Sequence, residues 1–192
     1  DAMPIKQFIK SKNFLFEKYF TLGKNYKIKE IFKKASAKNI ENVKSYKTLK
    51  NQKFIEFPKL GFKKLQQIIK KISSLNGCLL MIDYGYQKPN NQNTMQSVMG
   101  HKKNNIFKNL GKADVTSHVN FNLLQEFFLK NNLNVKKTIS QEKFLKNMGI
   151  VERAEIIAKK MKFSDQTNLY LRLKRLLSPK LMGNLFKVIL AY

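Results

Sequence analysis

Short clusters of apolar side chains, separated by lysine, fill the first part of the chain. Residues 4–34 alternate such clusters with lysine, and the run Gly23–Asn25 interrupts them. Aromatic and β-branched side chains on both sides of a turn of this kind predict strands joined by a hairpin. Residues 35–53 are polar and lysine-rich, which predicts a mobile loop, and a short strand is expected at 54–57, where Pro58 ends it.

The apolar pattern then changes to helical spacing and afterwards to a continuous run. Residues 62–75 carry apolar side chains at intervals of three and four, which predicts a helix of about four turns. The next run, Cys78–Ile82, is apolar throughout and predicts a strand buried on both faces of a parallel sheet. Because doubly wound sheets bind ligands outside the carboxyl ends of their strands, Asp83 is expected at a functional edge.

The second half of the chain predicts one long loop followed by helices and strands. Residues 87–119 are rich in Gly, Asn and Pro and contain both histidines, and a loop of this length is usually functional or disordered. Asn120 is expected to cap the helix that follows it. Periodicity and capping residues predict further helices at 140–149, 150–161 and 164–177, and strands at 133–139 and 185–190.

Length and composition favour a single folded domain. The chain has 192 residues, 43% of them hydrophobic, so it can bury a sizeable core and is too apolar for a disordered segment. No apolar run approaches the roughly 18 to 20 residues of a membrane span, so no membrane span is expected. The single cysteine, Cys78, is expected in the core, and the lack of an internal disulfide or a secretory leader favours a reducing cytoplasm.

The chain is strongly basic, with 38 Lys and Arg against 12 Asp and Glu and a net charge of +26. Such a charge usually indicates a nucleic-acid or anionic-membrane partner. However, only three of the basic residues are arginine, and residues 1–75 (19 basic, 5 acidic, +14) and 76–192 (19 basic, 7 acidic, +12) share the charge evenly. Together with 20 asparagines, this skew is typical of AT-rich codon usage. A lysine-coated surface without a dedicated nucleic-acid site is therefore favoured over a localised basic patch.

Four polar side chains are candidates for chemistry. The sequence has no glycine-rich phosphate loop, and one cysteine with two histidines is a poor zinc-binding set, so no metal site is expected. Asp83, after a buried strand, either caps loop amides or meets a ligand. Asp114 and His118 lie four residues apart, so that Asp114 or Thr116 could orient His118 as a general base, and His101 lies in the same loop. Structural hydrogen bonding is the alternative role for each histidine.

Five segments of the sequence resemble, in the same order, the sequence motifs of one known protein family. They are Asp1–Phe8, Leu80–Tyr86, Thr94–His101, Ala113–Phe121 and Met182–Val188. Together with the helical segment Gln141–Ala154, they resemble the MidA family of S-adenosyl-L-methionine-dependent methyltransferases, whose mitochondrial members assist assembly of respiratory complex I. The differences are few: Met3 and Met99 replace a leucine and an arginine, Asn120 replaces an aspartate, and residues 35–53 have no counterpart.

The resemblance implies that part of the methyltransferase domain lies outside this chain. In the family, a glycine-rich cofactor loop, an acidic residue that holds the ribose and an Asn-Glu pair precede the segment similar to Asp1–Phe8. The chain thus resembles the C-terminal portion of one methyltransferase domain, without its upstream cofactor-binding half. It is expected to be inactive alone, and Asp1 is the one contact to the cofactor expected within it.

The fold class implied by the resemblance is α/β. The chain would form the C-terminal part of a class I, Rossmann-like sheet with a β-rich insertion and a helical cover. The fifth, sixth and antiparallel seventh strands of that sheet would be residues 78–83, 133–139 and 185–190. The other assignments are 5–57 for the β-rich insertion, 60–85 for a helix and the central strand, 87–119 for a substrate-facing loop, and 120–192 for helices and closing strands.

The activity implied by the resemblance is methylation of an arginine on a protein partner, such as a complex I subunit, with S-adenosyl-L-methionine as cofactor. Carboxylates can align a guanidinium through paired hydrogen bonds. The residues expected to align the substrate are Asp83, His101, His118 and Asp114, and those expected in the substrate loop are Tyr84, Gly85, Gly100 and Thr116. The location would be the cytoplasm in a bacterium or the mitochondrion in a eukaryote.

The sequence does not indicate an oligomeric state. Two other functions also fit it. The first is a basic RNA- or ribosome-binding module, which would show a steep dependence of affinity on salt concentration. The second is a non-catalytic assembly factor that has the methyltransferase fold without the activity.

Overall fold

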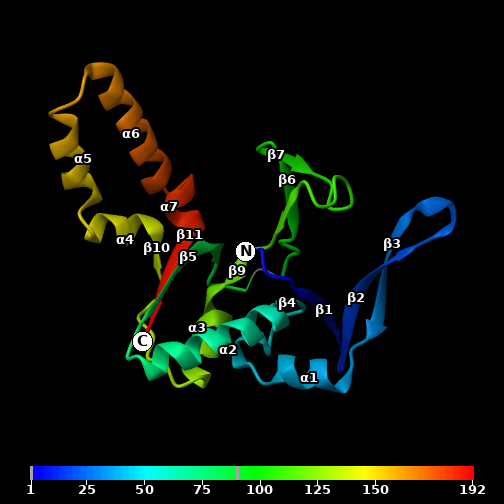
Figure 1. Ribbon diagram of the computed structural model, residues 1–192. Coiled ribbons are helices and arrows are strands. Elements are labelled where there is room, and N and C mark those ends of the chain that lie inside the picture. The colour runs from blue at the N-terminus through cyan, green and yellow to red at the C-terminus, as the bar shows by residue number, and fades with distance from the viewer. Residues whose placement is uncertain (1, 90) are drawn as a thin grey trace.

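The computed structural model describes residues 2–89 and 91–192 and shows a mixed α/β protein. Its strands form three sheets, two of four strands and one of three strands. Figure 1 shows a long β-hairpin projecting on one side and a helical hairpin on the other, with two helices, α2 and α3, below the sheets in the middle.

The first sheet is antiparallel and contains the strands expected in the first part of the chain. It comprises β1 (Lys6–Ser11), β2 (Phe14–Leu22), β3 (Ile28–Lys34) and β4 (Phe54–Phe57), in the order β3-β2-β1-β4. The predicted turn lies between β2 and β3, where Asn25 has a φ of 60°. Phe8 on β1 and Ile55 on β4 pair across the sheet and are fully buried. The outer part of the β2–β3 hairpin projects from the body (Figure 1).

The mobile loop predicted for residues 35–53 is wrong, because this segment contains a helix. Helix α1 (Ala37–Lys44) is capped by Ser36, whose side chain accepts a hydrogen bond from the Asn39 backbone N–H, and a 3₁₀ turn follows at Lys47–Leu49. Val43 and Leu49 are buried in the core. Two well-placed apolar side chains therefore anchor a segment whose composition is otherwise that of a loop.

The second sheet has the order β10-β11-β5-β9. Strand β5 (Leu79–Tyr86) pairs antiparallel with β11 (Phe186–Ala191) and parallel with the short β9 (Val119–Asn120), and β11 pairs antiparallel with β10 (Ile139–Ser140). The strands expected at 78–82 and 185–190 are thus confirmed in position. The strand expected at 133–139 is mostly wrong: this segment contributes an isolated bridge at Val135 and only its last residue to β10.

The structure corrects three expectations about β5 and the residues beside it. The strand is buried on one face only, since Leu80 is 46% exposed and Ile82 42% exposed, while Leu79 and Met81 pack against the core on the other face. Cys78 precedes the strand and is exposed, so it is not a core residue. Asp83 does not end β5, because pairing with Val119 and Asn120 extends the strand to Tyr86.

Two helices and the inner faces of the two larger sheets form one hydrophobic core. Helix α2 (Lys59–Ser74) covers the span predicted from periodicity, and α3 (Phe121–Lys130) begins at Asn120, which caps it as expected by accepting a hydrogen bond from the Leu123 N–H. Phe62 and Phe127 stack across the helix interface with ring centroids 4.1 Å apart. The core connects these helices to β1, β4 and β11, so both sheets are positioned by the same contacts.

Residues 87–119 are not a loop throughout, because they contain the third sheet. Its antiparallel strands are β6 (Gln96–Met99), β7 (Lys102–Asn104) and β8 (Asp114–Thr116), in the order β7-β6-β8. Gly100 and His101 form the tight turn between β6 and β7, with φ values of 56° and 61°. This small sheet stands above the N-terminal strands in Figure 1.

Three C-terminal helices follow the predicted pattern, namely α4 (Gln141–Asn147), α5 (Ile150–Ala158) and α6 (Phe163–Leu177). The short helix α7 (Met182–Leu185) has no counterpart in the sequence prediction. Helices α5 and α6 pack on each other and project away from the second sheet (Figure 1). In the part of the chain that the structure describes, no helix combines the length and apolar character needed to cross a bilayer.

Candidate functional site

A cavity of about 430 Å³ lies beside β5, where the N-terminal segment, β4, α2 and the start of α3 converge. Ligand pockets commonly have volumes of about 300 to 1,000 Å³. The side chains around it separate into an apolar wall and a polar group. The wall includes Ile5, Phe62, Leu65, Met81 and Leu124, and the polar group comprises Glu56, Asp83, Ser117, His118 and Asn120.

Glu56 on β4 is the most buried carboxylate of this cavity, with 5% of the residue exposed. Its Oε1 accepts hydrogen bonds from Gln7 Nε2 at 2.9 Å and from the Thr94 backbone N–H at 3.0 Å, and its Oε2 accepts one from the Thr94 hydroxyl. Gln7 Nε2 also donates to Asn93 Oδ1 at 2.7 Å. These donors fix the carboxylate in one orientation on a strand of the antiparallel sheet.

Thr94 connects Glu56 to His118. The Thr94 hydroxyl donates to Glu56 and accepts a hydrogen bond of 2.9 Å from the His118 backbone N–H. The His118 ring contacts the Tyr84 ring edge to face, with centroids 5.4 Å apart. Burial lowers the pKa of His118 below its ordinary value of 6.5, and the charges of Glu56 and Asp83 oppose that effect. An imidazole held neutral in this way can accept a proton at neutral pH.

Asp83 and Tyr86 are polar residues of β5. Asp83 is partly buried and its Oδ1 accepts a hydrogen bond of 2.8 Å from the Tyr84 backbone N–H. Tyr86 lies at the end of the strand, where burial raises the pKa of its hydroxyl to about 12, aided by the charge of Glu56 and opposed by a hydrogen bond with Asn120. Tyr86 is therefore neutral at physiological pH and can act as a hydrogen-bond donor.

The structure brings together some of the predicted site residues and separates others. Asp83 and His118 both line the cavity, whereas Tyr84 and Gly85 follow Asp83 on β5 and are not among the described residues that line it. Gly100 and His101 lie at the β6–β7 turn, and Asp114 and Thr116 lie on β8, and none of the four is among the described residues that line the cavity. Asp1, the predicted cofactor contact, lies outside the described residues.

Glu56 and Thr94 are functional candidates that the sequence does not reveal. Glu56 is a single acid within a four-residue apolar strand, and its partner Thr94 is 38 residues away. The one available signal was a charged residue between Ile55 and Phe57, which a buried strand does not accommodate without a specific partner.

The cavity differs in charge from the rest of the molecule. None of the described residues that line it is lysine or arginine, whereas the chain as a whole has 38 of them. Within the described ranges, no group of three His, Cys, Asp or Glu side chains is placed to hold a metal ion. The cavity therefore suits an organic ligand that is cationic or rich in hydrogen-bond donors.

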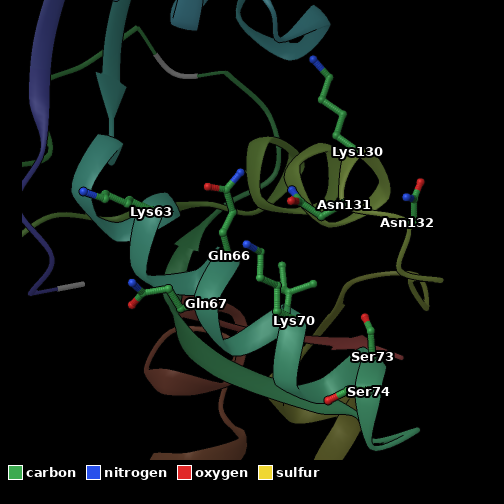
Figure 2. Close-up of a pocket in the computed structure, with 10 residues that line it drawn as sticks. Lys63, Gln66, Gln67, Lys70, Ser73, Ser74, Lys130, Asn131 and Asn132 are labelled. Carbon is green, nitrogen blue, oxygen red and sulfur yellow. The ribbon is translucent and has the colours of Figure 1, made fainter.

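A second, open groove of about 860 Å³ has the opposite character (Figure 2). It runs between α2 and the residues that follow α3, and polar side chains line it. On α2 these are Lys63, Gln66, Gln67, Lys70, Ser73 and Ser74, and after α3 they are Asn131 and Asn132 beside Lys130. Its lysines are exposed to solvent and favour an anion.

Comparison with known proteins identifies relatives of the chain. Residues 1–139 match a family described as "Putative S-adenosyl-L-methionine-dependent methyltransferase". The mitochondrial protein arginine methyltransferase NDUFAF7 of Xenopus tropicalis is 30% identical over 96 residues, covering 50% of this chain and 22% of that protein. The NDUFAF7 homologue of Caenorhabditis elegans is 27% identical over 157 residues, covering 80% of this chain and 36% of that protein.

Solved structures share the fold. A COG1565 superfamily member from Burkholderia thailandensis bound to S-adenosyl-homocysteine superimposes with a TM-score of 0.77 and 21% identity, covering 100% of this chain and 50% of that one. A native structure of a COG1565 superfamily protein from the same organism gives a TM-score of 0.79, with 52% of that chain covered. The chain thus spans about half the length of these proteins.

Proposed function

Because the chain belongs to the MidA-like (COG1565) family, described as S-adenosyl-L-methionine-dependent methyltransferases, we propose that it forms the substrate-binding half of such an enzyme. The target would be an arginine side chain of a protein partner, in an activity of the complex I assembly type. The acid-lined cavity without lysine or arginine carries this proposal, since it suits a guanidinium in an otherwise basic protein. Membership of this family and the mixed α/β fold do not depend on the identity of the substrate.

The order of the second sheet supports a class I methyltransferase arrangement. The sequence resemblance implies that residues 78–83, 133–139 and 185–190 are the fifth, sixth and antiparallel seventh strands, and in the structure β5, the shorter β10 and β11 would take these places. Strand β11 lies between β5 and β10 and is antiparallel to both. Parallel sheets of this class bind ligands at the carboxyl ends of their strands, and Asp83, Tyr84 and Gly85 lie in that half of β5. The antiparallel β1–β4 sheet would then be the insertion beside the substrate.

S-adenosyl-L-methionine would supply the methyl group, which a guanidinium nitrogen would take as the carbon–sulfur bond breaks, leaving S-adenosyl-homocysteine. The residues of this chain would bind and align the guanidinium. Asp83 would accept its hydrogen bonds, and neutral His118 would take the proton that nitrogen loses on methylation. The sequence of this chain contains no glycine-rich loop, so we expect it to bind the cofactor poorly by itself.

Calorimetry with S-adenosyl-L-methionine tests the proposal. We expect little binding to the 192-residue chain and clear binding to a protein extended upstream to the length of its relatives. Incubation of that protein with arginine-containing peptides, followed by mass spectrometry, should give methylated arginine, with severe loss in Asp83→Ala and His118→Ala. If the extended protein does not bind S-adenosyl-L-methionine, the enzyme assignment fails, and a non-catalytic assembly factor becomes the preferred function.

The expected location depends on the source of the protein. We expect the mitochondrion in a eukaryote, as for the relatives that are named mitochondrial, and the cytoplasm in a bacterium.

Polyanion binding is the second candidate, and the lysine-lined groove of Figure 2 favours it. Filter binding of RNA across a salt series distinguishes a specific site from diffuse lysines. If the groove is a specific RNA site, the affinity falls steeply with salt concentration. The slope of this dependence should then be smaller in Lys63→Gln and Lys70→Gln. A shallow slope that these substitutions do not change would exclude the groove as an RNA site.

A further inference from the structure

Two glutamates of the antiparallel sheet are equally buried but differ in how their charge is compensated. Glu17 on β2 is 3% exposed, forms an ion pair with Lys6 and accepts a hydrogen bond of 2.7 Å from Asn39 Nδ2. Glu56 on β4 is 5% exposed and has no ion-pair partner among the residues that the structure describes. A buried carboxylate without a cation is costly, so Glu56 is the exception that requires an explanation.

The hydrogen bonds of Glu56 position its carboxylate without neutralising it. Gln7 and Thr94 donate three hydrogen bonds to it, and all three donors are uncharged. A carboxylate offers about four lone-pair sites, which leaves one free for a further donor. Because Glu56 lines the cavity, that further donor can come from a ligand inside it.

The surrounding side chains define the shape and chemistry of such a ligand. Ile5, Leu65 and Met81 present an apolar wall that suits an aliphatic stem, and Asp83 places a second carboxylate on the same cavity. A planar guanidinium carries five N–H donors in a fixed fork, so it can engage two carboxylates at once. An arginine side chain matches both the apolar wall and the two acids.

We propose that Glu56 binds the cationic head of the substrate arginine, which makes the antiparallel sheet a direct part of the substrate site. This inference rests on the proposed function, and it assigns to Glu56 a role that Asp83 alone would otherwise fill. Thr94 positions both groups that face the ligand, since its hydroxyl donates to Glu56 and accepts from the His118 backbone N–H. The uncompensated charge of Glu56 is thus neutralised when the substrate binds.

Binding of a blocked arginine, N-acetyl-arginine methylamide, to the 192-residue chain tests the assignment. The ε-methyl signals of Met3 and Met81, which line the cavity, report on occupancy by NMR. We expect Glu56→Gln to weaken binding about tenfold or more, as loss of a hydrogen bond to a charged group does. Glu17→Gln is the matched control, because it removes the same charge from an equally buried site outside the cavity, and it should change the affinity less than about twofold.

A neutral isostere makes the test independent of any variant's folding. N-acetyl-citrulline methylamide has the shape of the arginine probe without its charge, and wild-type protein should bind it about tenfold more weakly. Equal affinity for the two probes would overturn the proposal. So would a folded Glu56→Gln variant that binds the arginine probe as wild type does. If the proposal holds, the ratio of the affinities for the arginine and citrulline probes should be smaller in Glu56→Gln than in the wild-type protein, because Asp83 is then the remaining carboxylate among the described residues that line the cavity.

The binding assay contains no S-adenosyl-L-methionine and no turnover, so it separates this inference from the proposed function. If the extended protein does not methylate arginine but Glu56-dependent binding of the arginine probe persists, only the methyltransferase assignment fails. If the extended protein methylates arginine and Glu56→Gln leaves the KM for the peptide unchanged, only the role of Glu56 fails. An increase in the KM for the peptide in Glu56→Gln, without an increase in Glu17→Gln, would support both the methyltransferase function and the role of Glu56.

Discussion

Gly85 allows β5 and β9 to approach at the carboxyl end of β5. A Cβ built at this position would lie 2.1 Å from the Val119 carbonyl oxygen and 2.9 Å from the Val119 nitrogen, and these backbone atoms cannot rotate away. We therefore expect Gly85→Ala to separate the strands and lower the free energy of unfolding by about 2 kcal/mol or more, measured by urea denaturation. Gly77→Ala is the control, since its nearest contact would be 3.7 Å. Similar losses in the two variants would contradict the close-approach argument.

His118 gives the stability of the protein a defined dependence on pH. Burial lowers the pKa of its imidazole below 6.5, so the unfolded state binds a proton more readily than the folded state. The stability contributed by neutral His118 is therefore present above pH 6.5 and is lost as the pH falls from 6.5 through the lowered pKa. Urea unfolding at about pH 7.5 and about pH 5.5 should show this loss, and it should be smaller in His118→Asn. NMR titration of the assigned ring protons provides a direct check, and a midpoint above 6.5 would contradict the prediction.

The residues of the candidate site show which part of a site a sequence can reveal. Asp83 was predicted because it directly follows the apolar run Cys78–Ile82, and His118 because it lies four residues after Asp114 in a segment rich in Gly, Asn and Pro. Glu56 could not be predicted, because its role depends on Thr94 and Gln7, which only the folded chain brings to it. His101 shares a sequence segment with His118, but a tight β-turn places it away from the cavity lining that the structure describes.

Among the structural elements, α3 depends on its capping residue. Asn120 is buried, and its side chain accepts the Leu123 N–H at 3.1 Å. Asn120→Ala should lower the free energy of unfolding by about 1 kcal/mol or more, since N-cap deletions cost about 0.5 to 2 kcal/mol and α3 belongs to the core. Ser140→Ala, which removes the cap of the peripheral α4, is the comparison and should cost less. A larger loss for Ser140→Ala, measured by urea denaturation, would contradict this order.

The exposed face of β5 predicts a surface that binds apolar probes. Leu80 and Ile82 point to the same side, and in the antiparallel register they pair with Leu190 and Val188 of β11. The double substitution Leu80→Thr and Ile82→Thr should reduce fluorescence of the dye ANS and self-association in sedimentation velocity, with little change in stability, because threonine suits an exposed strand. Met81→Thr faces the core side and should destabilise the protein instead. Unchanged ANS binding in the double variant would contradict the prediction.

Elements were predictable where their apolar pattern is periodic and not where pairing decides the structure. Helices α2 and α6 follow from three- and four-residue spacing, which only one backbone geometry satisfies. The burial of β5 did not follow, because a continuous apolar run looks the same whether one face or both are covered. The β6–β8 sheet did not follow from the sequence, because its short strands are mostly polar and are stabilised by pairing with each other rather than by a hydrophobic face.

At the scale of the whole molecule, the position of its few acidic residues is more informative than its excess of lysine. The described residues form four ion pairs, with Glu17, Glu30, Glu126 and Glu142, and each of these acids is matched with a nearby lysine. Glu56 is outside this set and faces the cavity. Because none of the described residues that line this acidic cavity is lysine or arginine, the cavity favours cations over anions, in contrast to the basic surface of the molecule.

The net charge of +26 on 192 residues also predicts how salt affects the stability of the whole molecule. With four ion pairs among the described residues, most of the 38 cations have no neighbouring acid, and their mutual repulsion opposes folding. Salt screens this repulsion over a Debye length of about 10 Å at 0.1 M, so the melting temperature should rise by several degrees between about 0.02 M and about 0.3 M NaCl. KCl should have the same effect at equal ionic strength, whereas a rise with sulfate alone would indicate anion binding instead of screening. A melting temperature that falls with NaCl would mean that ion pairs, and not repulsion, dominate the electrostatics of the folded chain.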